Sequence, residues 1–159
     1  MVTTAGVKCG IYTYSAYVCQ ALQELGLDIT ILGEHPFPDN RAIDPDFKTS
    51  VPIEYCWKRT DPYTQLIKES PKYNIIHLQH QYGLFPIEQN YVELLQKIHK
   101  PLVLTLHDVI APHPQFENYM KATINNSDKL IVHTQTCYTL LQSWGCPKEK
   151  IELIPHGTK

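Results

Sequence analysis

Short runs of apolar residues alternate along this chain with segments whose apolar residues recur at helical spacing. Seven of the runs predict strands: Met1–Thr4, Asp28–Gly33, Val51–Tyr55, Asn74–Gln79, Leu102–Leu106, Lys129–His133 and Ile151–Ile154. Runs such as LVLTL and KLIVH contain several β-branched residues and little polar alternation. That pattern is typical of strands covered on both faces, as in a parallel sheet.

The segments between the strands predict helices. The first is the clearest, because apolar residues from Ile11 to Leu25 recur at spacings of three and four. Further start and stop signals are Gly26 after this helix, Asp61 and Pro62 opening a second, Pro101 closing a third, Pro114 opening a fourth and Thr134 capping the last.

Repeated strand–helix alternation predicts an α/β fold, a Rossmann-like doubly wound and mostly parallel sheet of about seven strands with right-handed crossovers. The segment Glu34–Thr49 contains three prolines and no periodicity, so we expect a long surface loop there. Residues 1–159 fit a single domain.

Charge and hydropathy narrow the classes of partner. The chain has 14 basic and 16 acidic residues, a formal charge of −2, which argues against nucleic acid as a main partner. No apolar run approaches the roughly 20 residues that span a bilayer, and no signal peptide opens the sequence. The five cysteines form no CxxC pair, which favours free thiols in a reducing cytoplasm.

Polar and small residues gather where the predicted strands end. In an open parallel sheet, ligands bind outside the carboxyl ends of the strands, because side chains and helix N-termini meet there. Five of the eight histidines follow strands: His35, His80, His107, His133 and His156. Gly10 opens the first helix, and Asp108 and Thr134 stand beside two of these histidines. We therefore expect a ligand-binding edge, although a single histidine after a strand is most often structural.

Common motifs for other chemistry are missing. The sequence contains no GxGxxG fingerprint, no P-loop and no GxSxG elbow. Metal sites often use short local spacings such as HxxxH. Only His77 and His80 come near this spacing, and on a strand their rings would point to opposite faces. We therefore expect no metal.

Three segments carry a resemblance to a known family. They are VTTAGVKCGIYTYSAYVCQALQELGLDITILGE, NIIHLQHQYGLF, and KPLVLTLHDV together with DKLIVHTQTCYTLLQSWGCPKEKIELIPHG. The first is similar to the opening strand, glycine loop, helix and second strand of glycosyltransferase family 4, the retaining enzymes of the two-domain GT-B fold. The others resemble that family's histidine segments and the run leading out of its N-terminal domain.

The resemblance implies roles for particular residues. His107 matches the histidine that contacts the transferred sugar and is the implied catalytic residue. The implied substrate- and donor-binding residues are Gly10, His80, Asp108, His133 and Thr134. His156 would lie at the passage between the two domains. Gln81 departs from a glutamate common in the family, so no acid or base role is expected for it.

The implied activity is retaining transfer of a hexose from a nucleotide-sugar donor to a glycan, lipid-linked or small-molecule acceptor, without a metal or other cofactor. The family continues into a C-terminal, donor-binding domain that is absent from residues 1–159, so we expect the isolated chain to be inactive. The expected location is cytoplasmic, at the inner membrane face where the acceptor is lipid-linked.

Two other readings remain open at this point. The same architecture serves nucleotide-sugar epimerases, in which a histidine at the edge would act as a general acid or base. The chain could instead be a non-catalytic α/β domain that binds a sugar phosphate or a protein partner. A product assay separates the first reading from glycosyl transfer.

Overall fold

The computed structural model describes residues 1–35, 49–109 and 116–157, which form a sheet of seven parallel strands. The strands are β1 Val2–Thr3, β2 Ile31–Glu34, β3 Ile53–Trp57, β4 Ile76–His80, β5 Leu102–Leu106, β6 Lys129–Val132 and β7 Ile151–Leu153. Their order is β3-β2-β1-β4-β5-β6-β7, so the direction of winding reverses between β1 and β4. The predicted α/β, Rossmann-like doubly wound sheet is confirmed.

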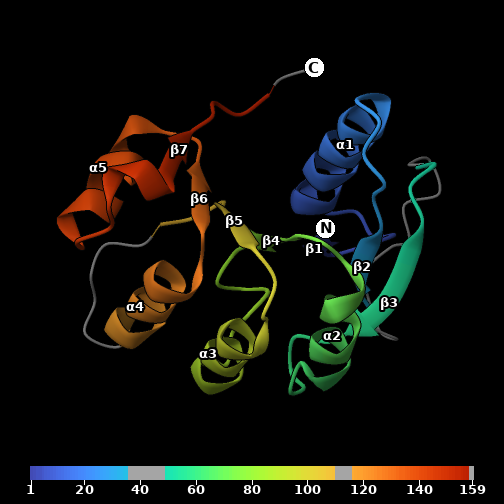
Figure 1. The fold of residues 1–159 in the computed structure, drawn as a ribbon, viewed down its shortest axis with the longest axis horizontal. Helices are drawn as coiled ribbons and strands as arrows, with labels where there is room; N and C mark the ends of the chain where they lie inside the picture. The colour runs from blue at the N-terminus through green and yellow to red at the C-terminus, as the bar shows by residue number, and fades with distance from the viewer. Residues whose placement is uncertain (36–48, 110–115, 158–159) are drawn as a thin grey trace.

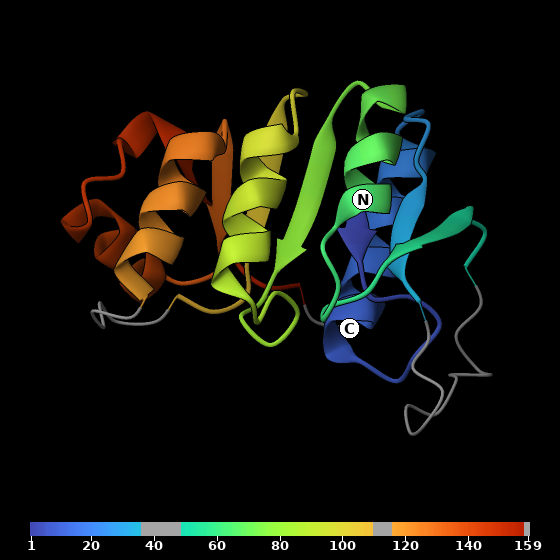
Figure 2. The ribbon, with the colours of Figure 1, turned by 90° about the horizontal axis from the view of Figure 1, so that it is seen from below.

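Helices cover both faces of the sheet. They are α1 Gly10–Glu24, α2 Thr64–Glu69, α3 Glu88–Lys97, α4 Glu117–Asn126 and α5 Gln135–Ser143, with short 3-10 turns at Ser70–Lys72 and Lys148–Lys150. Helices α2, α3 and α4 line one face, and α1 and α5 lie on the other (Figures 1 and 2). None of the helices among the described residues is long and apolar enough to cross a membrane.

Most predicted helix boundaries agree with the structure, and one is wrong. The Thr134 hydroxyl accepts a bond from the Cys137 N–H at 3.2 Å, which confirms the predicted cap of α5. Gly26 follows α1 with φ of +86°, the left-handed conformation that ends many helices. Helix α2, however, begins at Thr64 with Tyr63 at its N-cap, and not at Pro62 with Asp61 as the cap. The predicted start at Pro114, like residues 36–48 of the predicted loop, lies outside the described residues.

The boundary error at α2 has a cause in the core. Tyr63, which directly precedes α2, is only 2% exposed and packs against Trp57 and Phe85, with ring centroids 6.2 and 5.5 Å away. Burial of this large ring fixes the chain one residue before the helix, and no side chain caps α2. The local signal of Asp61 and Pro62 is therefore overridden by tertiary packing.

The core beneath α2, α3 and α4 contains a stack of aromatic rings. The Trp57 and Phe85 rings stack at 5.3 Å between centroids, and the Tyr91 and Tyr119 rings stack at 4.1 Å. His80 lies among them with no exposed surface. Aromatic rings of this size contribute much of the buried apolar area of a small domain, so this cluster anchors the edge on which the strands end.

An ion pair holds the other half of the same edge. Arg59, after β3, donates from Nε to Oε1 of Glu34 at 2.6 Å and from Nη1 to the Gly83 carbonyl at 3.0 Å. Glu34 ends β2 and is buried, and Gly83 lies in the loop after β4. One guanidinium group thus ties the end of β2 to the loops that follow β3 and β4.

Candidate functional site

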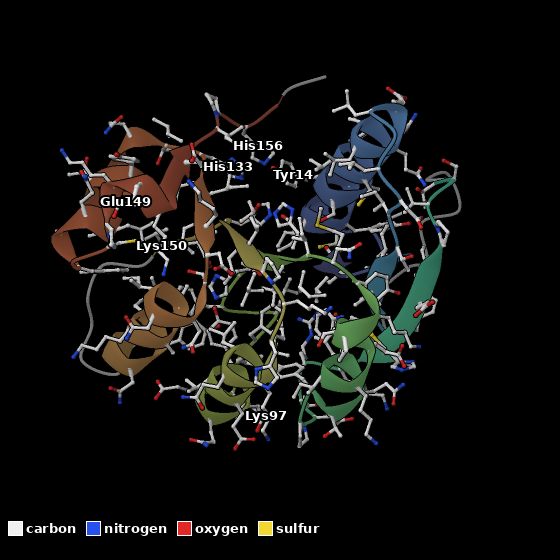
Figure 3. All side chains as sticks on the ribbon, in the orientation of Figure 1. Tyr14, Lys97, His133, Glu149, Lys150 and His156 are labelled. Atoms are coloured by element: carbon white, nitrogen blue, oxygen red, sulfur yellow. The ribbon has the colours of Figure 1, made fainter. Side chains whose placement is uncertain are left out.

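Three histidines converge at the carboxyl ends of β5, β6 and β7. The ring centroids of this histidine triad, His107, His133 and His156, lie 5.4, 4.8 and 6.3 Å apart in the pairs 107–133, 133–156 and 107–156. Tyr14 of α1 contacts all three rings, at centroid distances of 5.0, 5.4 and 4.9 Å. Figure 3 shows Tyr14, His133 and His156 beside one another between α1 and α5.

The pleat of the sheet brings these rings to one face. Gln79 of β4 pairs with Thr105 of β5, and Thr105 pairs with Ile131 of β6. Alternate residues of a strand point to the same face. His107 lies two residues after Thr105, and His133 two residues after Ile131, so both histidines lie on the same face of the sheet as Thr105 and Ile131. That face is the one covered by α1 and α5, whose first turns open at the same edge (Figure 1).

The orientation of His107 is fixed from below. Its Nε2 lies 2.8 Å from Oε1 of Gln79, a buried side chain whose amide nitrogen contacts the Met1 sulfur at 3.0 Å and His77 Nε2 at 3.3 Å. An amide oxygen can only accept, so His107 Nε2 carries the proton. Nδ1 of His107 therefore keeps its lone pair.

His133 has a complementary arrangement. Its Nδ1 donates to the Ile154 carbonyl at 2.8 Å, which ties the end of β6 to the segment after β7. The other ring nitrogen, Nε2, is buried and has no hydrogen-bond partner among the described residues. A buried nitrogen lone pair without a partner is costly, and it marks this ring as one that can accept a bond from a ligand.

His107 is held in its neutral form by its surroundings. Burial, followed by repulsion from the nearby His133 and His156 rings, lowers the pKa of His107 to about 4. At neutral pH the His107 ring is therefore an uncharged hydrogen-bonding group and not a cation. Such a ring can accept a hydrogen bond from a hydroxyl or coordinate a metal ion, but it cannot neutralise a phosphate.

The start of α1 provides the open surface next to the triad. Gly10 is the first residue of α1 and is exposed, and a Cβ built on it would meet no atom within 4 Å. The fold itself therefore does not require glycine at this position. The free N–H groups of a helix N-terminus favour an anionic ligand. Thr134 is likewise exposed at the start of α5, where its hydroxyl caps the helix.

His80 and Asp108 are placed differently. The His80 ring faces the aromatic core, on the opposite side of β4 from Gln79, and its Nε2 lies 2.8 Å from the Tyr119 hydroxyl. Burial lowers the pKa of His80 to about 3. Asp108 is 34% exposed, and its Oδ1 lies 3.9 Å from His80 Nδ1. The structure thus brings Asp108 to the edge but closes His80 off from a ligand, and the binding roles of both stay predictions.

The sequence does not predict a role at the site for two residues that contact the triad, Tyr14 and Gln79. Tyr14 belongs to the helical repeat of α1 and is indistinguishable there from a core residue. Gln79 precedes His80 inside a strand, but strand alternation places it on the face of His77 and could have shown its position below His107. No sequence pattern predicts that Tyr14 of α1, a helix that packs on β1, reaches the histidines at the ends of β5 and β6.

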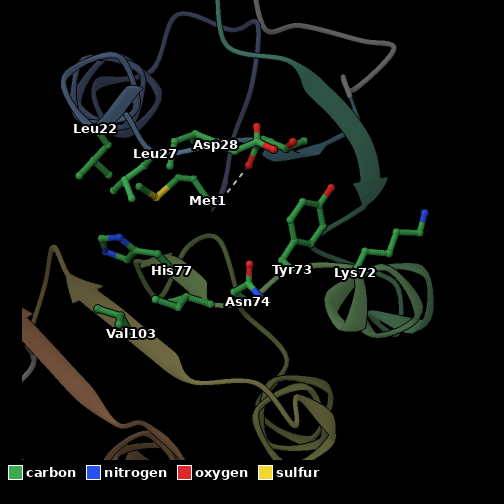
Figure 4. Close-up of a pocket in the computed structure, with 12 residues that line it drawn as sticks. Met1, Leu22, Leu27, Asp28, Lys72, Tyr73, Asn74, His77 and Val103 are labelled. Carbon is green, nitrogen blue, oxygen red and sulfur yellow. Dashed lines mark hydrogen bonds between the residues drawn. The ribbon is translucent and has the colours of Figure 1, made fainter. Parts of the chain in front are cut away.

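A separate hollow of about 470 Å³ lies at the opposite end of the sheet. Met1, Leu22, Leu27, His77 and Val103 are among its lining residues (Figure 4). These residues precede or begin the strands, whereas ligands of parallel sheets bind where the strands end. Its size alone does not make it the functional site. One lining residue, His77, contacts Gln79, the residue that orients His107 at the ligand edge.

The fold and the edge define a doubly wound α/β domain with its ligand side at the carboxyl ends of the strands. The profile of Glycosyltransferase Family 4 matches residues 9–159, and the chain belongs to this family. A search of curated protein sequences returned no significant relative.

Solved structures show the same architecture. The fold is similar to HepE of Anabaena in complex with UDP and glucose, with a TM-score of 0.62 and 13% sequence identity. It is similar to the same protein in complex with UDP-glucose, with a TM-score of 0.63 and 14% identity. Both alignments cover 99% of this chain and 43% of the other, so the chain spans less than half the length of these structures. The GT-B-type, Rossmann-like assignment is confirmed.

Proposed function

We propose that this chain forms the acceptor-side domain of an enzyme that transfers a hexose, with retention, from a nucleoside-diphosphate sugar to a glycan, lipid-linked or small-molecule acceptor. The observation that carries the proposal is His107: a neutral ring at the ligand edge, oriented by Gln79, with the Nδ1 lone pair left over. Family membership supports the transfer reaction, and HepE has been solved in complex with UDP and glucose and with UDP-glucose.

Each predicted site residue has a task in this proposal. His107 accepts a hydrogen bond from a hydroxyl of the transferred sugar through Nδ1 and so positions the reacting carbon. The start of α1 at Gly10 faces the diphosphate, where backbone N–H groups stabilise the charge of the leaving group. His133 and Thr134 line the acceptor side, with Asp108 beside them. The proposed reaction assigns no step to a metal ion.

The donor is proposed to need a second domain. The chain corresponds to 43% of the length of the HepE structures, and the remaining length of HepE has no counterpart in residues 1–159. We therefore expect transfer by the full-length protein, in the cytoplasm or at the inner membrane face, and none by these residues alone.

The direct test is a product assay with UDP-glucose and other nucleoside-diphosphate hexoses. The full-length protein is expected to release the nucleoside diphosphate and form a glycoside whose anomeric configuration, read by NMR, matches that of the donor. A folded full-length protein that releases no nucleotide from any of these donors would overturn the proposal. A free nucleotide sugar with an inverted hydroxyl would identify an epimerase. A glycoside of inverted anomeric configuration would contradict the retaining mechanism but not the glycosyl transfer.

Gly10 offers a test that separates fold from function. Gly10→Ala is expected to leave the melting temperature unchanged, because the added Cβ meets no atom within 4 Å. If the donor diphosphate approaches this backbone, the methyl group obstructs it, and kcat/KM is expected to fall about tenfold or more. Ala21→Ser, at an exposed position near the other end of α1, is the matched control. Equal kcat/KM for Gly10→Ala and the control would show that the diphosphate does not lie here.

A further inference from the structure

The histidine triad has the geometry of a ligand set for a metal ion. One ring nitrogen from each of His107, His133 and His156 lies within 4.8 Å of the others. In a tetrahedral zinc site, bonds of about 2.0–2.1 Å place the ligand nitrogens about 3.3 Å apart. Changes in the side-chain torsions must close this difference, and His156 is the exposed ring of the three.

Hydrogen bonds already select the coordinating nitrogens of two rings. His133 donates from Nδ1 to the Ile154 carbonyl and keeps a buried, unpartnered Nε2. His107 is bonded through Nε2 to Gln79 and keeps Nδ1. A histidine that binds a metal characteristically uses its second nitrogen to donate to a carbonyl or a carboxylate, which fixes the tautomer and the ring plane. Both rings meet this condition, one through a backbone carbonyl and the other through a side-chain amide.

The composition of the set selects the kind of ion. The cluster found among the described residues consists of three imidazoles without a carboxylate. Imidazole nitrogen suits zinc, copper, nickel and cobalt, whereas magnesium and calcium prefer oxygen ligands. Three protein ligands leave a fourth position for water or another donor. Tyr14, packed against all three rings, limits their movement and forms one wall of the space.

We propose that His107, His133 and His156 bind one divalent transition-metal ion of the zinc class, with the fourth coordination position open. The expectation of no metal rested on local spacing and on the family resemblance. These histidines are brought together instead by three neighbouring parallel strands. The metal site does not rest on the proposed glycosyl transfer, and no step of the transfer is assigned to the ion. His107 Nδ1 has a single lone pair, so the ion and a sugar hydroxyl exclude each other at this atom. Each can fail without the other.

The test is a titration of the untagged, metal-stripped full-length protein with Co²⁺, followed by absorption in the visible range, and with Zn²⁺, followed by calorimetry. One equivalent is expected to bind at the triad, with the intense Co²⁺ bands of four- or five-coordinate geometry. His133→Ala and His156→Ala are each expected to weaken binding about 100-fold or more, and Gln79→Leu, which removes the partner of His107, by about 10- to 100-fold.

The control is His99→Ala, since His99 is exposed in the loop after α3 and takes no part in the triad. It is expected to bind as the wild type does. His156→Ala changes an exposed side chain, so its circular dichroism and melting temperature without metal are expected to match those of the wild type. Stoichiometric binding that survives both His133→Ala and His156→Ala, or a wild type with no one-equivalent binding, would overturn the proposal.

Discussion

Replacement of His107 by alanine in the full-length protein is expected to lower kcat for sugar transfer by about 100- to 1,000-fold, the loss typical of removing one oriented hydrogen-bonding group at a reacting centre. The ring is fixed by Gln79 and kept neutral by burial, so its Nδ1 is in place before substrate binds. Alanine removes this contact and leaves Gln79 Oε1 without its donor. Initial rates with saturating donor and acceptor measure the effect.

Two further variants show whether the loss comes from the ring itself. His99→Ala, far from the edge, is expected to keep the wild-type kcat. Gln79→Leu retains His107 but releases its tautomer and orientation, so kcat is expected to fall by about tenfold while circular dichroism stays unchanged. A His107→Ala protein whose kcat stays within threefold of the wild type would show that the sugar is bound elsewhere.

Much of the fold could be predicted because each strand is signalled locally. Leu102–Leu106 and residues 130–132 consist only of leucine and β-branched residues, and the structure places them in neighbouring strands covered on both faces. Helix α5 was recognisable for a similar reason, because its cap, Thr134, acts on a residue only three positions away. The predicted start of α2 is wrong because a contact between residues far apart in the sequence, the burial of Tyr63, determines where this helix begins.

The site could be predicted only in part, because sequence shows which residues leave the strands but not which face they take or what lies above them. The strand pattern predicts His107 and His133 at the same edge, and they lie side by side. His80 was placed with them, but it ends β4 on the opposite face and is buried in the aromatic core. Tyr14 reaches the triad from α1, which packs on β1, and no local pattern predicts this long-range contact.

Acid is expected to destabilise the domain well before its carboxylates are protonated. Burial lowers the pKa of His77 to about 4, of His80 to about 3 and of His107 to about 4, against about 6.5 in an unfolded chain. Between these values the unfolded state binds more protons than the folded state, so the free energy of unfolding falls as the pH drops below about 6.5. Above that pH these rings are neutral in both states and stability is independent of them.

The size of the effect is set by the most buried ring. At pH 5, His80 alone is expected to cost about 2 kcal/mol, since 1.5 pH units below its unfolded pKa correspond to about 1.36 kcal/mol each. His77 adds to this loss, and His107 adds less because its ring is partly exposed. Burial raises the pKa of Asp108, which works in the opposite direction at lower pH. A typical domain is stable by about 5–15 kcal/mol, so the loss is a large share.

Urea unfolding at pH 7.5, 6 and 5 measures this dependence. The wild-type midpoint is expected to fall steeply between pH 6 and 5. His80→Gln can still hydrogen-bond to the Tyr119 hydroxyl but cannot take up a proton, so its stability at pH 7.5 is lower while its decline toward pH 5 is shallower by about 2 kcal/mol. His99→Ala, which removes an exposed histidine, is expected to keep the wild-type slope. If His80→Gln loses as much stability between pH 7.5 and 5 as the wild type does, His80 does not remain neutral in the folded state. A histidine whose pKa is the same in the folded and unfolded states adds nothing to the pH dependence of stability, so its removal would not change that dependence.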